Sequence, residues 1–193
     1  MNASQLCILS LVVLSMLLAW SAPCNASTVC GPCTCVDDFL LSCGNTTTIS
    51  LNNMGLTNLS ASAFQQSTSV KYLSLSNNQL VDLPGGLFQA TTKLTDLDLD
   101  GNQLTQLPEG LFRTTKELDQ LDVTNNQLVD LPAGLFQATS KLTSLYLLNN
   151  RIRHLPVGLF RTTTALSEID LDTNQLTQLP EGLFRTTKEL QSL

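Results

Sequence analysis

The chain has 193 residues, of which 13% are charged and 5% are aromatic, and its formal net charge is −6 at pH 7. This length fits one ordinary domain or one short array of repeats. The ten Lys and Arg residues form no basic patch, which argues against binding to the phosphate backbone of nucleic acid, and a mild acidic excess by itself indicates little beyond solubility.

Residues 1–26 are predicted to be a secretory signal peptide. Residues 6–19 are almost entirely apolar, and small residues follow at Ser21, Ala22 and Ala26. Cleavage after Ala26 leaves an even number of cysteines, whereas cleavage after Ser21 leaves an odd one. The alternative is a membrane anchor, but the apolar run is shorter than the about 20 residues that a membrane span needs. We therefore expect a secreted or extracellular chain with no membrane span after removal of the signal.

Residues 27–45 are predicted to form a disulfide-bonded cap. They hold cysteines in the pattern C-x2-C-x-C-x7-C, at Cys30, Cys33, Cys35 and Cys43. Thiolates at short spacing also suit zinc, but Cys33 and Cys35 are one residue apart, which is awkward for a tetrahedral site, and a secreted chain meets oxidising conditions. Two disulfides are favoured, for which the sequence alone allows three pairings. A stapled cap would cover the apolar core and strand edge of the first repeat.

Residues 46–193 are a series of about six 24-residue repeats, the last one incomplete. The repeated line is L-x-x-L-x-L-x-x-N-x-L-x-x-L-P-x-x-L-F, and its Asn recurs at Asn78, Asn102, Asn126, Asn150 and Asn174. The first repeat, 46–69, is degenerate, and a new one begins at Leu190. Period and pattern are those of the leucine-rich repeat. They predict an α/β solenoid, a horseshoe whose concave face is a parallel β-sheet.

Each repeat is expected to place its residues in the same way. In Leu97-Asp98-Leu99 the leucines point inward and Asp98 points outward, by the alternation of a strand. The repeated Asn is predicted to satisfy buried backbone groups of its own coil and of the next coil. Pro-x-Gly-Leu-Phe suits a tight turn or one helical turn. The phenylalanines are predicted to stack as a spine under the convex side: Phe64, Phe88, Phe112, Phe136, Phe160 and Phe184.

From Cys30 onward the sequence resembles extracellular leucine-rich-repeat proteins with an amino-terminal cysteine cap. Lines such as 126–136 are similar to those of the variable lymphocyte receptors of jawless vertebrates, and the Slit proteins and platelet glycoprotein Ib share the plan. The resemblance implies the disulfides Cys30–Cys35 and Cys33–Cys43, and ligand binding on the concave sheet. These families also carry a carboxy-terminal cysteine cap, whereas no cysteine follows Cys43 in this sequence.

The concave face is the predicted site of function. Its outward positions, three per repeat from Tyr72 to Asp172, hold seven of the sixteen acids and none of the ten bases. Two acidic triplets lie three repeats apart, or about 14 Å at 4.8 Å per strand, and Tyr146 and Leu148 are expected to be exposed between them. We predict a binding site for a basic protein, centred on Tyr146 and Leu148. The candidate residues are Tyr72, Asp96, Asp98, Asp100, Asp122, Tyr146, Leu148, Glu168, Asp170 and Asp172.

Other interpretations of these acids stay open. They could serve only to keep the sheet soluble, or carboxylates on alternate residues of a strand could share a calcium ion, although calcium sites usually recruit loop carbonyls. We expect no cofactor. We also expect no enzyme, because the single histidine, His154, lies beside Arg153 in a loop. The acidic triplets lie on an open face and not in a cleft that excludes water.

Sequons at Asn45 and Asn58 predict N-glycosylation of an exported chain, and Asn25 carries a further one. The function expected is non-catalytic recognition or adhesion outside the cell. One alternative is a structural matrix or cell-surface spacer protein. Another is a fragment of a larger transmembrane receptor, because the coil that begins at Leu190 stops at Leu193 and would leave apolar side chains open to water.

Overall fold

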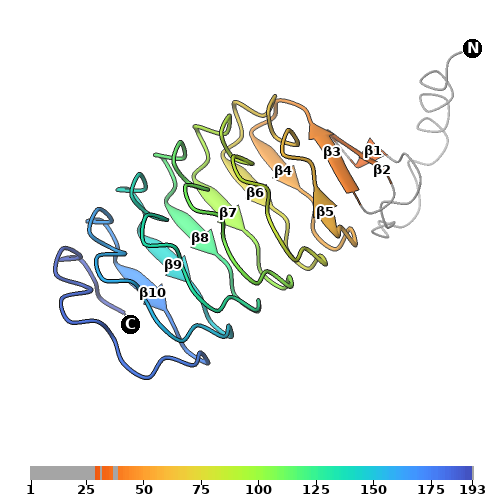
Figure 1. The fold of residues 1–193 in the computed structure, drawn as a ribbon. Coiled ribbons are helices and arrows are strands. Elements are labelled where there is room, and N and C mark those ends of the chain that lie inside the picture. Colours follow the sequence, from red (N-terminus) through yellow and green to blue (C-terminus); the bar gives the residue numbers. More distant parts are fainter. Residues whose placement is uncertain (1–28, 31, 37–38, 193) are drawn as a thin grey trace, which may run out of the picture.

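The structure is a computed structural model that describes residues 29–30, 32–36 and 39–192; the predicted signal peptide lies outside these residues. The described part is a stack of coils with strands along one face (Figure 1), and no helix is assigned in it. Its strands are β1 (Val29–Cys30), β2 (Cys33–Val36), β3 (Phe39–Cys43), β4 (Thr48–Ser50), β5 (Asn58–Leu59), β6 (Tyr72–Ser74), β7 (Asp96–Asp98), β8 (Gln120–Asp122), β9 (Ser144–Tyr146) and β10 (Glu168–Asp170).

The main sheet contains one strand from each coil and confirms the predicted parallel sheet and 24-residue period. Its order is β10-β9-β8-β7-β6-β4, with parallel pairing throughout. Leu73 lies opposite Leu97, which lies opposite Leu121, so equivalent residues of successive repeats stand side by side. The middle residue of each strand is buried because it points into the coil.

The repeated Asn satisfies buried backbone groups, as predicted, and Asn126 illustrates the hydrogen bonds that it forms. The side chain is 7% exposed. Its Nδ2 donates to the carbonyls of Leu99 (3.0 Å), Val123 (3.1 Å) and Thr124 (3.0 Å), and its Oδ1 accepts the N–H of Leu104 (3.0 Å). Leu99 and Leu104 belong to the preceding coil, so the expected link to the next coil was wrong in direction. Each Asn therefore joins its coil to the one before it.

The phenylalanine spine is also confirmed. Successive rings stack from Phe64 to Phe184 with centroids 5.6–6.2 Å apart. A second ladder, which the sequence analysis missed, supports the same turns: a buried Thr hydroxyl donates to the carbonyl of the Phe three residues before it. The threonines are Thr91, Thr115, Thr139, Thr163 and Thr187.

The residue before the repeated Asn has a left-handed backbone in every coil. It is Asn77, Gly101, Asn125 or Asn149, with φ between 53° and 65°, and Thr173 in the last such turn, with φ 53°. Asn and Gly tolerate this region, whereas a β-branched residue is a true outlier there. Thr173 therefore holds local backbone strain that its counterparts avoid.

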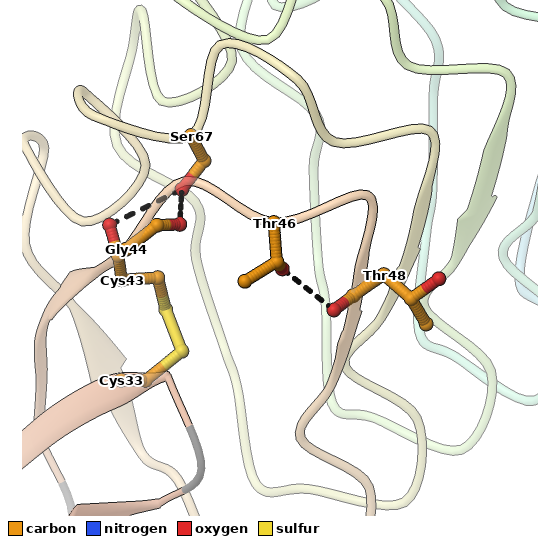
Figure 2. The surroundings of a disulfide bond; sticks show 6 residues. All are labelled: Cys33, Cys43, Gly44, Thr46, Thr48 and Ser67. Atoms are coloured by element: carbon orange, nitrogen blue, oxygen red, sulfur yellow. Dashed lines mark hydrogen bonds between the residues drawn. A yellow bond between two sulfur atoms is a disulfide. The ribbon is translucent and has the colours of Figure 1, made fainter.

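The amino-terminal end is covered by a small sheet of order β1-β2-β3-β5. A disulfide joins Cys33 to Cys43 (Figure 2), as the resemblance implied. Ser67 Oγ in the first repeat donates to the carbonyls of Cys43 (3.2 Å) and Gly44 (3.0 Å), which anchors the cap to the first coil. The side chain of Cys30 lies outside the described part, so the pairing Cys30–Cys35 stays a prediction.

The coil at 166–189 is less covered than those before it. Leu179 is 42% exposed, whereas its counterpart Leu107 is 2% exposed. Leu171 and Leu176 are half-buried, while the equivalent leucines of the inner coils are fully buried. The side chains of this coil are therefore more accessible to water than the equivalent side chains in the middle of the stack.

Candidate functional site

The predicted concave-face residues fall into three rows across the main sheet. The first row is in register with Tyr72, the middle row with Ser74, and the third row follows two residues after the middle row. The first row contains Tyr72, Asp96 and Glu168; the middle row Asp98, Asp122, Tyr146 and Asp170; the third row Asp100, Leu148 and Asp172. All the predicted site residues therefore share one face.

The exposure of this face differs from the prediction at several positions. Ser74 and Ser76, expected to be exposed, are buried at 0% and 5% exposure. Ser74 Oγ donates to Asp98 Oδ2 at 2.6 Å, so the carboxylate of the next strand covers it. Tyr146 and Leu148, also expected to be exposed, are half-buried, whereas Tyr72 is 39% exposed. The accessible aromatic surface thus lies partly at the amino-terminal end of the face.

Asp98 and Asp122 are directly opposite each other on β7 and β8. Like charges in this position oppose one another. The pKa of Asp122 is raised above its ordinary value, mainly by burial of the carboxyl; hydrogen bonds from Thr124 oppose this shift, and the nearby Asp100 and Asp98 make smaller contributions that raise the pKa. Ionisation of Asp122 is therefore opposed first by its burial and to a smaller extent by the neighbouring carboxylates.

The middle-row aspartates also have a local structural role. Asp98 Oδ1 accepts the N–H of Asp100 (3.0 Å), Asp122 Oδ1 that of Thr124 (2.8 Å), and Asp170 Oδ1 that of Asp172 (2.9 Å). Each bond turns the chain as it leaves the strand, as Asp side chains commonly do. An Asp at the end of a strand, two residues before another polar residue, is the sequence pattern that indicates this turn, and the sequence analysis did not predict it.

Tyr146 links the last two strands of the sheet. Its hydroxyl donates to Glu168 Oε2 at 2.8 Å. This bond is the main cause of the raised pKa of Tyr146, because ionising the phenol would lose it, and burial adds to the effect. Asp172, by contrast, is exposed, and no hydrogen bond reaches its carboxylate in the described part. The site therefore combines a fixed aromatic side chain with freely accessible charge.

Within the described residues, no Lys, Arg or His forms an ion pair with the acids of this face. The only ion pair in the described part joins Lys141 to Glu117, away from the concave rows. Arg151 and Arg153 are exposed near the rim, and Arg153 Nε donates to Gln175 Oε1 (3.1 Å) and not to a carboxylate. The seven carboxylates thus present an uncompensated negative surface.

The described residues offer little for metal binding or catalysis. They contain no group of three or more His, Cys, Asp and Glu placed to hold a metal ion, so the calcium interpretation gains no support from the acidic triplets. His154 is exposed, and its backbone pairs with that of Asp130. Among these residues there is also no helix with the length and hydropathy of a membrane span.

The repeat geometry agrees with comparison to known families. The family model described as Leucine rich repeat matches residues 44–104, 92–152 and 140–193. The chain belongs to the leucine-rich-repeat family. Members of this family are typically scaffolds for protein interaction, without catalytic activity of the repeats themselves. A comparison with curated proteins gives no match.

Solved structures of leucine-rich-repeat proteins resemble the fold. One is the Toll–Spatzle complex of Drosophila, with 27% identity and a TM-score of 0.68 over 82% of this chain and 24% of that chain. Another is the leucine-rich-repeat domain of APL1B, with 30% identity and a TM-score of 0.64 over 68% and 39% of the two chains.

The LRIM1/APL1C complex, at 21% identity and a TM-score of 0.64 over 81% of this chain and 36% of that chain, shows the fold alone. This chain thus spans 24–39% of the length of these three proteins. The particular similarity to variable lymphocyte receptors, Slit and platelet glycoprotein Ib stays a prediction.

Proposed function

We propose that this leucine-rich-repeat protein is a non-catalytic extracellular recognition module that binds a basic protein on its concave face. The observation that carries the proposal is the charge of that face: seven carboxylates, no Lys or Arg among its rows, and no ion pair to any of them in the described part. Such a surface speeds encounter with a basic partner and disfavours an acidic one.

The aromatic residues would supply the contact area that charge alone does not. Tyr146 is held by Glu168, and Leu148 follows two residues later, just past the end of β9. A side chain that is already fixed loses less conformational entropy when a partner covers it. Tyr and apolar residues surrounded by charge are typical of the centre of a protein interface.

The comparisons support recognition at the level of the fold. Toll, at 27% identity, forms a complex with Spatzle. The proposed location outside the cell rests on the apolar leader at 6–19 and on the Cys33–Cys43 disulfide, because such bonds persist in oxidising compartments.

The test compares two charge reversals of equal size. Asp96→Lys with Asp172→Lys changes the concave face without removing the carboxylates that turn the chain after each strand. Glu109→Lys with Glu181→Lys is the control, because both residues are exposed at the same position of identical convex turns. Wild type and both variants are immobilised and exposed to an extracellular protein mixture, and the bound proteins are quantified by mass spectrometry.

We expect the wild type and the convex variant to retain the same basic proteins and the concave variant to lose them. Because the attraction is electrostatic, retention should also weaken as salt rises from 50 to about 500 mM, as screening predicts. Equal retention by all three proteins at low salt would contradict binding through the acidic concave face.

A second candidate is a structural matrix or spacer protein. The bonds of Asp98, Asp122 and Asp170 to the following N–H groups favour it, because they explain three of the seven acids without a ligand. The unchanged recurrence of 102–118 at 174–190 also fits a spacer, in which coils need not differ. The same experiment separates the two, since a spacer would show no set of proteins lost with the concave variant alone.

A further inference from the structure

The outer surface of the cap exposes a large aromatic side chain. Phe39 in β3 is 37% exposed, whereas its neighbour Leu40 is fully buried. This is the alternation expected of a strand with one face in the core and one in solvent. Leu41, at 38% exposure, adds to the apolar area where β2 and β3 go out of register. Phe39 thus lies on the side of the cap away from the core.

A glycosylation sequon lies beside this ring. β5 pairs with β3 in parallel, and its register places Asn58 opposite Phe39 and Leu59 opposite Leu40. Leu59 is buried like Leu40, and Asn58 is exposed like Phe39, so both outer side chains point away from the core. Adjacent strands are about 4.8 Å apart, which is within reach of one sugar ring. Asn58-Leu59-Ser60 fits N-x-S/T.

We propose that Asn58 carries an N-linked glycan whose first sugar packs against the ring of Phe39. In the modification, the Asn58 amide nitrogen bonds to the anomeric carbon of a lipid-pyrophosphate-linked oligosaccharide. The bond from that carbon to the pyrophosphate oxygen breaks, the lipid pyrophosphate leaves, and the amide loses one proton. The glycan replaces solvent over Phe39 with the apolar C–H face of a sugar, which removes apolar area from water and makes the sugar part of the cap.

This inference rests on the proposed extracellular location, since the donor is met only on the export route. Asn58 is well placed for the reaction because it is exposed, and its Nδ2 has only a 3.2 Å hydrogen bond to the adjacent Thr57. Asn45 offers a matched control. It is an exposed sequon residue whose Oδ1 accepts the N–H of Ser69 at 2.7 Å, and none of the strand pairs of the described residues places an aromatic residue opposite it.

The experiment uses the full chain, with residues 1–26, in secretory cells that attach high-mannose glycans. Glycopeptide mass spectrometry measures occupancy at both sequons. Thermal unfolding is then compared for the full glycan, for the form trimmed to one sugar, and for Asn58→Gln, each with Phe39 and with Phe39→Ala. Asn45→Gln is measured in both backgrounds. Nuclear Overhauser contacts between the single sugar and the Phe39 ring give a readout that does not depend on stability.

We expect Asn58 to be occupied and the one-sugar form to keep the Tm of the full glycan. Asn58→Gln should lower the Tm by about 2–4 °C, which corresponds to the loss of about 1 kcal/mol in a chain of this size. It should have no effect once Phe39 is Ala. Any effect of Asn45→Gln should be the same in both backgrounds. An unmodified Asn58 beside an occupied Asn45, an equal Tm loss with and without Phe39, or absent sugar–ring contacts would overturn the inference. Absence of sugar at both sites in an unsecreted chain would instead overturn the location, and this inference with it.

Discussion

Replacing Asn126 by Ala tests how the coils are held together. The variant removes four hydrogen bonds, but their losses are unequal. The carbonyls of Leu99, Val123 and Thr124 each accept a second hydrogen bond, from Asn102, Asn150 and Gly101 respectively, and keep that partner. The N–H of Leu104 has Asn126 Oδ1 as its acceptor and is buried. That one donor is therefore left without a partner inside the stack.

The cost follows from these partners. An unsatisfied buried N–H costs about 1–3 kcal/mol, and three carbonyls that keep one partner add about a further 1 kcal/mol together. We expect Asn126→Ala to lower the free energy of unfolding by about 2–4 kcal/mol. The measurement is urea unfolding followed by circular dichroism, with the slope of the transition checked for a single cooperative step.

Asn174→Ala is the matched control. Asn174 makes the same kinds of bonds, to Leu147, Leu171 and Asp172 and from Ile152, but in the less covered coil. Asn174 itself is half-buried, whereas Asn126 is 7% exposed, so water can replace its side chain more easily and we expect at most half the loss found at Asn126. An equal loss at both positions, or a loss below about 1 kcal/mol at Asn126, would refute the argument that burial of the backbone groups sets the cost.

Three further predictions follow from the same structure. Thr173→Asn should raise the free energy of unfolding by about 1 kcal/mol, because Asn adopts the left-handed backbone of this position at a lower cost than Thr. The reverse change Asn149→Thr should lower the free energy of unfolding, and urea unfolding measures both. Ala138→Thr should stabilise by about 0.5–1 kcal/mol, since the equivalent Thr114, Thr162 and Thr186 donate to the Phe carbonyl of the preceding coil, whereas Ala138→Val should not. Asp122→Asn should stabilise at pH 7 and should lose this gain on acidification below the ordinary pKa of Asp, as measured by unfolding across pH.

The sign of the last prediction comes from linkage. A folded-state pKa raised above the unfolded value means that the native protein binds the proton more tightly, so Asp122 lowers stability as pH rises through that window. Removing the Asp122 carboxyl therefore raises the free energy of unfolding only at pH values above that window. A gain at Asp122→Asn that persists at low pH would contradict the electrostatic cause. Equal effects of Thr and Val at position 138 would contradict the hydrogen bond, and a loss at Thr173→Asn would contradict strain.

Much of the fold could be predicted because the repeat specifies the same local environment in every coil. Leu97 and Leu99 point inward by strand alternation, and the 24-residue spacing of Phe112 and its equivalents requires a stacked spine. The direction of the Asn126 bonds could not be predicted, because the coils on both sides have the same sequence pattern. The 24-residue recurrence of Thr115 is present in the sequence, but no buried role was predicted from it, because the period alone does not say whether a polar residue points inward.

The site was predictable in position but not in exposure. Alternation places Asp98 and Tyr146 on the concave face, and the register confirms that they share a row. How much of each side chain meets solvent depends on the size and rotamer of its cross-strand neighbours, which the pattern does not contain. Ser74 is buried because the carboxylate of Asp98 lies over it, and Tyr146 is half-buried because it turns toward Glu168.

Side-chain footprinting with hydroxyl radicals tests the proposed binding face most directly. The protein is labelled with and without a basic protein retained by the wild type, and oxidation is quantified at single residues. The proposal predicts protection of Tyr72, Tyr146 and Leu148, with unchanged labelling of Val157, which is 78% exposed in a convex turn. Protection of Val157 with unchanged labelling of the two tyrosines would contradict recognition through the concave face.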